Sequence, residues 1–460
     1  MFNPDIFRTY DIRGLADTEL MDDIVYELGL AYGVYVKSKI KNQKSKLKIG
    51  VGRDVRLSSD RISKSLIKGL IDSNLDVTDV GVVPTPVLYF SVFKYNYDGG
   101  IMITGSHNPK EYNGFKVLIG KETIYGDEIQ NLRKCMEKLE HEKQETTLKG
   151  TLTNFSPVKD YIDLIKTKID INPKSKFIID PGNGTCGPIT MQIFKELKCD
   201  VECINCVPDG NFPAHLPDPT VPKYMTQLVN RVRETKADLG IGYDGDGDRI
   251  GVVDELGNVI WGDKLLGVFA KYVLKDKPGS SIIFEVKCSQ GLVEYIKSLG
   301  GNPVMWKAGH SLIKAKMKEL NAPLAGEMSG HMFFAHNYYG YDDAIFASIK
   351  VLEILSKDKR PISEIVNEIP SYFSTPEIRV DSDDKTKFEI VEKLKNYFKG
   401  RYPIIDIDGV RIQFDDGFGL VRASNTQPVL VLRFEAQTEK RLNEMQTEIM
   451  GKLNELLKKT

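Results

Sequence analysis

The chain has 460 residues, of which 41% are hydrophobic and 28% are charged, and its formal net charge is −1. This length exceeds what one hydrophobic core supports, so about three or four domains are expected. The neutral charge balance argues against a nonspecific nucleic-acid-binding or membrane-binding surface, and no apolar run reaches membrane-spanning length. We therefore expect a cytoplasmic protein that binds neither nucleic acid nor a membrane.

The first third of the chain alternates helical and strand-like segments, which is typical of an α/β domain. A polar segment from His141 to Pro157 marks the first boundary. The predicted segments are a helix from about Glu19 to Lys39, a strand from Leu47 to Val51, a helix opening near Ser58, a strand from Val77 to Val82, a helix after Pro84 and a strand from Gly100 to Ile103.

The alternation restarts after this boundary and changes character near Pro370 to Pro376. The predicted segments are a helix from Val158 to Lys168, strands at Phe177–Asp180, Asp238–Tyr243 and Ile250–Val253, strands near Ile282 and Pro303, helices after Gly262, Ser289 and Gly309, strands at Val410–Phe414, Gly419–Arg422 and Val429–Phe434, and a closing helix from about Glu439. We expect α/β domains over residues 1–152, 153–258 and 259–369, and a smaller α+β domain over residues 370–460.

The six cysteines do not suggest a disulfide framework in a chain of this size, and they favour a reducing compartment. Cys199, Cys203 and Cys206 have a spacing that resembles an iron–sulfur cluster loop. However, the segment around Cys199 and Cys203 alternates apolar and polar residues, as a half-buried strand does. We therefore interpret these cysteines as small hydrophobic residues of a strand.

The stretch Thr104-Gly-Ser-His-Asn-Pro109 follows the buried strand that ends at Ile103. In open α/β sheets, the carboxyl ends of the strands border the ligand crevice, so Ser106 is a candidate nucleophile. The alternative is a surface turn in which Ser106 and Asn108 cap local backbone groups.

The stretch Asp244-Gly-Asp-Gly-Asp-Arg249 places three aspartates at alternate positions, separated by glycines. Such a loop brings several carboxylate oxygens onto one hard cation, and magnesium is the natural occupant. A calcium-binding EF-hand is excluded because Arg249 replaces the required glycine and a strand follows. A dinucleotide loop is excluded because carboxylates would repel a pyrophosphate. A solvated Asp-Gly turn remains as an alternative.

Two further loops carry polar groups suited to a sugar phosphate. Gly326-Glu-Met-Ser-Gly-His331 combines a carboxylate, a hydroxyl and an imidazole, which suit sugar hydroxyls and proton transfer. Arg422-Ala-Ser-Asn-Thr426 combines a guanidinium with hydroxyl and amide groups, which suit a phosphate, although a capped turn is an equal alternative. Each predicted domain therefore supplies one candidate loop, as a central cleft would require.

Together with Phe7-Arg-Thr-Tyr-Asp-Ile-Arg-Gly14, these loops resemble the α-D-phosphohexomutase superfamily, in the order found in that family and over nearly the whole chain. Within it, the chain looks like the bacterial phosphomannomutase/phosphoglucomutase group. Phosphoglucosamine mutases more usually carry Gln in the position of Met328 and Gly in the position of Asn425. One departure is Gln427, where many members have Glu. The resemblance implies three α/β/α domains and a fourth domain around a central cleft.

The resemblance also implies a reaction, which interconverts hexose 6-phosphate and hexose 1-phosphate, of mannose and of glucose, through an enzyme phosphoserine and a 1,6-bisphosphate. One Mg2+ per active site would be held by Ser106, Asp244, Asp246 and Asp248, and glucose or mannose 1,6-bisphosphate would act as activator. The catalytic residues implied are Ser106, His107, Arg13, Lys116, Arg249 and His331. The substrate-binding residues implied are Tyr10, Lys287, His310, Glu327, Ser329, Arg422, Ser424, Asn425 and Thr426.

Other functions are compatible with the same loops. A phosphoglucosamine mutase would use the same loops on an amino sugar. A magnesium-dependent sugar phosphatase would use the same phosphoserine but release inorganic phosphate, and a sensor would bind the sugar phosphate without turnover. The sequence is compatible with a monomer but does not fix the oligomeric state. It identifies neither the preferred epimer, nor the general base, nor the pathway supplied.

Overall fold

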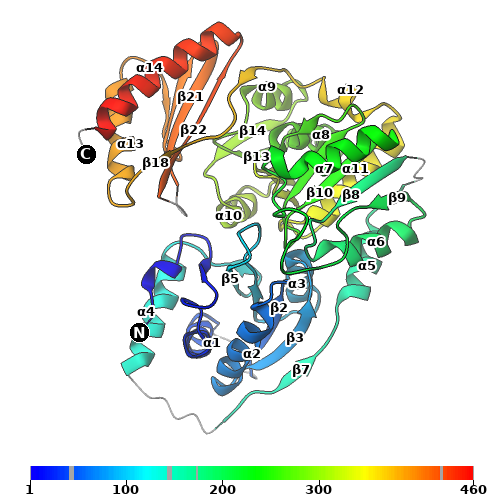
Figure 1. The fold of residues 1–460 in the computed structure, drawn as a ribbon, viewed down its shortest axis with the longest axis vertical. Coiled ribbons are helices and arrows are strands. Elements are labelled where there is room, and N and C mark those ends of the chain that lie inside the picture. Colours follow the sequence, from blue (N-terminus) through cyan, green and yellow to red (C-terminus); the bar gives the residue numbers. More distant parts are fainter. Residues whose placement is uncertain (1, 41–45, 142–147, 172–174, 425–427, 459–460) are drawn as a thin grey trace. The chain divides into compact units, whose positions relative to one another are not determined.

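The protein is described by a computed structural model that covers residues 2–40, 46–141, 148–171, 175–424 and 428–458. It divides into a larger unit, Met1–Gly262 with Ser329–Ser363, and a smaller unit, Asp263–Met328 with Glu364–Thr460. Figure 1 follows the chain from blue to red through these units. Within the described residues, no helix combines the length and the apolar character needed to cross a membrane.

The first sheet of the larger unit mixes parallel and antiparallel strands. Its elements are a short 3-10 helix η1 (Pro4–Ile6), β1 (Ile12–Leu15), α1 (Asp22–Lys39), β2 (Lys48–Arg53), α2 (Ser59–Asp72), β3 (Asp76–Val82), α3 (Thr85–Lys94), β4 (Gly99–Ile103), β5 (Tyr112–Ile119), β6 (Glu122–Thr123), α4 (Asp127–His141) and β7 (Leu152–Asn154). The strands lie in the order β1-β5-β4-β2-β3-β7, with β6 beside β5. Strands β4, β2, β3 and β7 are parallel, and β5 runs antiparallel to β4 and β1.

Alternation along β2 explains why helices cover both faces of this sheet. Ile49 and Val51 point into a core that also contains buried side chains of α1, α2 and α4. Gly50 lies on the opposite face, since successive strand residues point to opposite sides. A Cβ at Gly50 would lie 2.9 Å from the ring of Tyr97, which follows α3, and 3.3 Å from Leu88 of α3, so the glycine allows this segment to approach closely.

The second sheet of the larger unit carries three parallel strands. Its elements are α5 (Val158–Thr167), β8 (Lys176–Asp180), α6 (Cys186–Glu196), β9 (Asp200–Cys203), α7 (Pro222–Thr235), β10 (Leu239–Tyr243), β11 (Ile250–Asp254) and β12 (Val259–Ile260), and β16 (Met332–Phe334) and α11 (Ala344–Asp358) also belong to this unit. The order is β12-β11-β10-β8-β9, with β8, β9 and β10 parallel. The loops that follow these three strands therefore leave the same edge of the sheet.

The smaller unit contains a parallel sheet and an antiparallel sheet. The first is built from α8 (Gly262–Asp276), β13 (Ser281–Glu285), α9 (Gln290–Ser298), β14 (Asn302–Trp306), α10 (His310–Leu320) and β15 (Leu324–Gly326), in the strand order β14-β13-β15. The second is built from β17 (Phe373–Ser374), β18 (Ile378–Asp381), α13 (Lys387–Phe398), β19 (Ile404–Ile405), β20 (Val410–Phe414), β21 (Gly417–Ala423), β22 (Val429–Ala436) and α14 (Glu439–Leu457), after the short α12 (Ile362–Val366). Its order is β17-β22-β21-β20-β19, with β18 also beside β22.

These sheets confirm the predicted fold class of three α/β/α domains followed by a smaller α+β domain, while the predicted domain boundaries stay predictions. One predicted bound is shifted, because α1 begins at Asp22 and not at Glu19. The Glu19 carboxylate instead accepts hydrogen bonds from the backbone nitrogen of Leu15 (2.7 Å) and from Asn3 Nδ2 (2.7 Å), which holds this segment in a turn.

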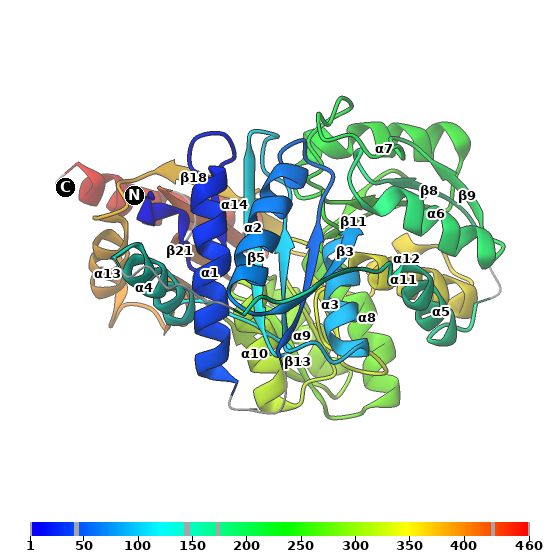
Figure 2. The same ribbon diagram turned by 90° about the horizontal axis from the view of Figure 1, so that it is seen from below.

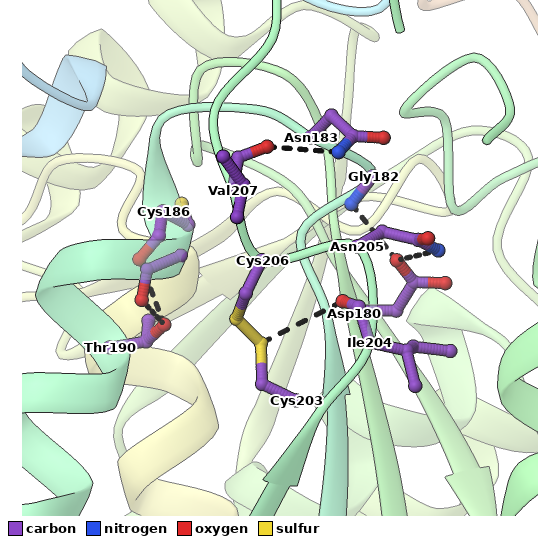
Figure 3. Close-up of a disulfide and its surroundings, with 11 residues drawn as sticks. Asp180, Gly182, Asn183, Cys186, Thr190, Cys203, Ile204, Asn205, Cys206 and Val207 are labelled. Atoms are coloured by element: carbon purple, nitrogen blue, oxygen red, sulfur yellow. Dashed lines mark hydrogen bonds between the residues drawn. A yellow bond between two sulfur atoms is a disulfide. The ribbon is translucent and has the colours of Figure 1, made fainter. Parts of the chain in front are cut away.

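The interpretation of three cysteines as strand residues is correct for Cys203 and wrong for Cys199 and Cys206, and it did not anticipate the disulfide that joins Cys203 to Cys206 (Figure 3). Only Cys203 lies in β9. The chain turns after it, with Asn205 in the left-handed region (φ 53°), and the turn returns Cys206 towards Cys203. Apolar periodicity identified the strand but carried no signal for the turn that ends it.

Two glycines fix the packing of α1 against α2, which lie side by side (Figure 2). A Cβ at Gly69 would overlap the carbonyl oxygen of Tyr26, and a Cβ at Gly29 would lie 2.6 Å from the carbonyl oxygen of Leu66. Neither obstacle is a flexible side-chain end. The two helices therefore cannot accommodate a methyl group here without moving apart.

We expect Gly69→Ala to lower the free energy of unfolding by about 1–3 kcal/mol, because overpacking forces the backbone to shift. The control is Gly451→Ala, at an exposed position of α14 with no atom within 4 Å of the added Cβ. This control should gain about 0.5–1 kcal/mol, because alanine favours a helix. Unfolding midpoints in differential scanning calorimetry check both. A Gly69→Ala protein as stable as the parent would contradict the packing argument.

Candidate active site

Ser106 follows β4 at the carboxyl end of the strand and is only 2% exposed. Its φ of 49° lies in the left-handed region, which residues other than glycine rarely adopt. The Ser106 backbone nitrogen donates to Thr104 Oγ1 (2.8 Å). Its hydroxyl donates to Asp244 Oδ2 (2.7 Å) and lies 3.1 Å from His107 Nδ1. A strained backbone is thus held with its hydroxyl directed at the aspartate loop.

The backbone around Ser106 is held by a buried arginine that the sequence analysis missed. The guanidinium of Arg56 donates to the carbonyl oxygens of Ser106 (2.8 Å), Asn108 (2.6 Å), Pro109 (2.6 Å) and Tyr112 (2.9 Å). Asp54 in turn accepts from Arg56 Nε (3.1 Å) and from the backbone nitrogen of Gly105 (3.1 Å). The available signal was the pair of opposite charges, Asp54 and Arg56, directly after β2. Because β2 runs parallel to β4, these residues lie at the same end of the sheet as Ser106.

The aspartate loop follows β10 in a tight turn. Asp244 Oδ1 accepts hydrogen bonds from the backbone nitrogens of Asp248 and Arg249, both at 3.1 Å. Gly247 adopts a φ of 75°, which allows the chain to turn within the loop. All three aspartates are buried, and one carboxylate oxygen each from Asp244, Asp246 and Asp248 lie within 4.8 Å of one another. The predicted convergence of three carboxylates is present.

The protein compensates only part of this negative charge. Lys116 Nζ pairs with Asp246 Oδ2 (2.7 Å) and with Asp248, and Thr85 Oγ1 donates to Asp246 Oδ2 (2.5 Å). Among the described residues, Asp246 Oδ1 finds no hydrogen-bond donor although it is buried. Burial, and then the nearby carboxylates of Asp248 and Asp246, raise the pKa of Asp244 well above its usual value. Buried oxygen ligands with uncompensated charge fit a hard cation.

His331 is oriented beside this loop by partners on both ring nitrogens. Its Nε2 lies 3.4 Å from Asp248 Oδ1, and its Nδ1 lies 3.0 Å from Ser329 Oγ. A β-bridge also joins the backbones of Arg249 and His331. With Asp248 and Asp342, His331 forms a second group whose ligand atoms lie close enough to share a metal. Two potential metal-binding groups therefore overlap at Asp248.

Arg13 lies beside the Ser106 loop. Its Nη1 donates to Asn108 Oδ1 (2.8 Å) and its Nη2 pairs with Asp11 (2.5 Å). Tyr10 lies in the turn before β1 and is partly buried. Of the predicted residues in the larger unit, the structure brings ten together at the two loops; they are Ser106, His107, Arg13, Lys116, Asp244, Asp246, Asp248, Arg249, Ser329 and His331.

In the smaller unit, three predicted residues lie after the carboxyl ends of parallel strands. Lys287 follows β13, His310 begins α10 after β14, and Glu327 follows β15. Glu327 Oε1 accepts from the backbone nitrogen of Gly309 (2.6 Å), directly before His310. Glu285, fully buried, accepts from the backbone nitrogen of Lys287 (2.8 Å). Carboxylates thus hold the backbones that carry Lys287 and His310.

Arg422 is held by a residue that the sequence analysis missed. Asp408 Oδ2 lies 3.0 Å from Arg422 Nη2 and accepts from the backbone nitrogen of Ala308 (3.0 Å). Ser424 is buried, and its backbone nitrogen donates to the carbonyl oxygen of Val429 (3.0 Å). The predicted Asn425 and Thr426, and Gln427 beside them, lie outside the described residues.

Comparison with protein families finds four matches along the chain. The alpha/beta/alpha domains I, II and III of the phosphoglucomutase/phosphomannomutase family match residues 4–143, 159–257 and 261–373. The C-terminal domain of the same family matches residues 377–452. The four matches follow the order of the sheets.

Individual relatives match nearly the whole chain. The phosphomannomutase/phosphoglucomutase of Pseudomonas aeruginosa is 44% identical over 449 residues, which make up 97% of this chain and 95% of that protein. The crystal structure of a phosphoglucomutase/phosphomannomutase family protein from Burkholderia thailandensis has a TM-score of 0.91 and 39% identity, and the match covers 99% of this chain and 98% of that chain.

A more distant structure shares the fold. It is the N-acetylphosphoglucosamine mutase of Aspergillus fumigatus in complex with GlcNAc-6P and magnesium, with a TM-score of 0.64 and 15% identity over 98% of this chain and 96% of that chain. The resemblance inferred from the four loops is thereby confirmed by matches that extend far beyond those loops. The chain belongs to the phosphoglucomutase/phosphomannomutase family and is a phosphohexomutase.

Proposed function

We propose that this phosphohexomutase transfers the phosphoryl group through Ser106, with one magnesium ion held by Ser106, Asp244, Asp246 and Asp248. The observation that carries the proposal is the hydrogen bond of 2.7 Å from Ser106 Oγ to Asp244 Oδ2. Oxygen ligands of this kind suit Mg2+, and the Aspergillus relative was solved with magnesium. Bound Mg2+ would offset negative charge on the phosphoryl oxygens.

The proposed cycle begins with a phosphate on Ser106. The O6 hydroxyl of a hexose 1-phosphate attacks the phosphorus, the bond from phosphorus to Ser106 Oγ breaks, and a hexose 1,6-bisphosphate forms. After the bisphosphate has reversed its orientation, Ser106 Oγ attacks the other phosphate and the hexose 6-phosphate leaves. Free glucose or mannose 1,6-bisphosphate acts as activator, because it rephosphorylates an enzyme that has lost its phosphate.

The residues around Ser106 are assigned to charge and proton transfer. Lys116, paired with Asp246 at 2.7 Å, keeps a positive charge beside the reacting oxygens. Arg249 adds a second cation next to the aspartate loop. His331, Arg13 or Lys116 assists proton transfer at the substrate hydroxyl. The partners on both ring nitrogens hold the His331 imidazole in one orientation. His107, 3.1 Å from Ser106 Oγ, contacts the nucleophile itself.

Binding of the substrate is assigned to the remaining predicted residues. The phosphate that is not transferred is bound by Arg422, Ser424, Asn425 and Thr426, and the sugar by Tyr10, Lys287, His310, Glu327 and Ser329. We assign mannose and glucose phosphates as substrates, and glucosamine phosphate is the competing candidate. A phosphatase would release inorganic phosphate from these substrates, whereas a mutase returns an isomerised sugar phosphate, so one coupled assay separates the two activities.

The first prediction is that active enzyme carries one phosphate, on Ser106, because the first transfer must come from the enzyme. Intact mass and peptide mapping of a freshly purified, active preparation check this. Treatment with substrate lacking bisphosphate contamination should lower the phosphorylated fraction as bisphosphate escapes, and added glucose 1,6-bisphosphate should restore it. An active preparation phosphorylated only at other positions would rule out the assignment.

The second prediction is that Asp246→Asn lowers turnover by about a hundredfold or more, since one anionic metal ligand is lost. The matched control is Asp254→Asn, at a buried aspartate that caps the turn after β11. This control should keep near-normal turnover. Rates are measured across a magnesium titration, with circular dichroism to check folding. Near-normal activity of Asp246→Asn at saturating Mg2+ would remove the metal assignment.

The third prediction concerns the sugar, which must bind in two orientations. Glucose and mannose share the O3 and O4 configuration that Glu327 and Ser329 are proposed to read, so both 1-phosphates should react with comparable kcat/KM. Galactose inverts C4 and leaves a buried polar group poorly paired. We expect its 1-phosphate to be rejected by at least about a hundredfold in kcat/KM.

Two variants of Glu327 separate recognition from support of the backbone. Glu327→Gln retains an oxygen that can accept from the Gly309 nitrogen, whereas Glu327→Ala does not. If Glu327 reads the sugar through its charge, both variants should lose discrimination against galactose 1-phosphate. Discrimination that survives in Glu327→Ala would show that this side chain does not read C4.

A further inference from the structure

Cys203 and Cys206 form an accessible pair with the spacing of redox-active cysteines. The sequence Cys203-Ile-Asn-Cys206 is a Cys-x-x-Cys motif, and the two Cα atoms lie 5.8 Å apart, within the usual range for a disulfide. Both residues are partly exposed, and the neighbouring Val207 is 75% exposed. By contrast, Cys186 and Cys288 are buried. A thiol reductant can therefore reach this pair.

The pair lies at the edge of the sheet that carries the aspartate loop. Cys203 is the last residue of the edge strand β9 and pairs in register with Ile179 of β8. Strands β8, β9 and β10 are parallel. The 181–185 turn, the Cys203–Cys206 segment and the aspartate loop therefore all follow the carboxyl ends of these strands, on one side of the sheet. The disulfide thus closes one of three neighbouring loops.

Asn183 connects the disulfide loop to the neighbouring turn by three hydrogen bonds (Figure 3 shows the side-chain one). Its backbone nitrogen donates to the carbonyl oxygen of Asn205 (2.9 Å), and its Nδ2 donates to that of Val207 (2.9 Å). Its own carbonyl oxygen accepts from the backbone nitrogen of Asp209 (2.9 Å). Asn183 and Asn205 both have left-handed backbones, so these contacts hold two strained residues together.

The same turn contacts the aspartate loop directly. The backbone nitrogen and Oγ1 of Thr185 both donate to the carbonyl oxygen of Gly245, each at 3.0 Å. Gly245 lies between two of the aspartates, and a Cβ there would lie 2.5 Å from the carbonyl oxygen of Ser106. Backbone contacts therefore run without interruption from the disulfide loop through Asn183 and Thr185 to Gly245 and Ser106.

A second route runs through the residues that follow Cys206. A Cβ at Gly210 would lie 2.5 Å from the carbonyl oxygen of Val55, so this segment packs closely on the chain after β2. The Phe212 ring lies over the Arg56 guanidinium at 5.2 Å. Arg56 is the residue whose hydrogen bonds hold the Ser106 backbone. The disulfide loop thus reaches Ser106 from two sides.

We propose that Cys203 and Cys206 form a reversible dithiol–disulfide site, and that the disulfide form keeps the Ser106 and aspartate loops in the arrangement that phosphoryl transfer requires. The second half of this proposal rests on the proposed function of those loops. A dithiol reduces the site: its thiolate attacks one sulfur, the bond between Cys203 and Cys206 breaks, and two thiols form as the reductant closes to a cyclic disulfide. Two electrons and two protons pass to the protein, and the reverse exchange restores it.

Reduction lowers activity because it removes the covalent constraint on the turn at Asn205. The left-handed conformation of Asn205 presents its carbonyl oxygen to Asn183, and an open chain has more conformations available at this residue. Small displacements of a reacting group lower turnover strongly, so we expect a reversible decrease of at least about threefold in kcat on reduction.

The first experiment tests the site without using activity. Full-length protein is equilibrated in mixtures of reduced and oxidised glutathione or dithiothreitol, quenched, alkylated and mapped by mass spectrometry. Cys203 and Cys206 should change together from unlabelled to labelled as the mixture becomes reducing, while Cys135 and Cys199 are labelled throughout. Independent labelling of Cys203 and Cys206 in the most oxidising mixtures would overturn the site.

The second experiment measures turnover of glucose 1-phosphate in the same mixtures, with Mg2+ and glucose 1,6-bisphosphate. Turnover should follow the fraction of disulfide, and the double variant Cys203→Ser/Cys206→Ser should show the low rate in every mixture. Cys135→Ser/Cys199→Ser is the matched control and should respond like the parent. Turnover that stays constant while the pair opens, or a response that persists in Cys203→Ser/Cys206→Ser, would overturn the coupling to the active site.

The two experiments also separate this proposal from the proposed function. A protein whose Cys203 and Cys206 open and close together, but whose turnover survives Ser106→Ala, keeps the dithiol–disulfide site and loses the assignment of the nucleophile. Circular dichroism of Cys203→Ser/Cys206→Ser distinguishes loss of the fold from loss of the constraint, and the parent protein reports the coupling by itself.

Discussion

Negative charge buried at the carboxyl end of β10 is the constraint on which the rest of the larger unit depends. Three like charges in a buried turn repel strongly unless cations or hydrogen-bond donors compensate them. The donors come from the first sheet of this unit and from a helix packed on it: Lys116 from β5 and Thr85 from the start of α3 both reach Asp246. Electrostatics thus join two α/β layers at one loop, and the side chain at their junction is the hydroxyl of Ser106.

Backbone carbonyl groups supply the second constraint. Arg56 holds the Ser106 loop through carbonyl oxygens, and Thr185 holds the aspartate loop through that of Gly245. A carbonyl oxygen carries no charge that would change if Ser106 gained and lost a phosphate, as the proposed cycle requires. A scaffold built on such acceptors therefore keeps its hydrogen bonds through both halves of the proposed cycle, whereas a scaffold built on the reacting groups would not.

The sequence predicted best what local pattern determines. Short apolar runs identified β2, β4 and β10, and the polar loops after them identified Ser106 and the aspartates. The sequence analysis missed Arg56, Thr85 and Asp408, because each contacts partners far away in the sequence. Arg56 carried one local signal, the opposite charge of Asp54 beside it, and that signal does not identify its distant partners. The sequence analysis missed the disulfide for a related reason. Alternation of apolar and polar residues predicts a strand, but it does not predict the turn that pairs the cysteines, which depends on one left-handed residue, Asn205.

Left-handed backbones gather around the proposed site and have a physical consequence. Ser106, Asn183, Asn205 and Phe212 all have positive φ values and lie in the loops that follow β4, β8 and β9. Each costs about 1–3 kcal/mol of strain and persists only where neighbouring contacts over-determine it. Those contacts are isolated hydrogen bonds and ring contacts, whereas the sheets beneath are held by continuous ladders of hydrogen bonds between strands. A perturbation therefore changes the conformation of the loops before it unfolds the sheets. Activity can for this reason be altered at the loops without loss of the fold, whereas a change in the core would affect the fold itself.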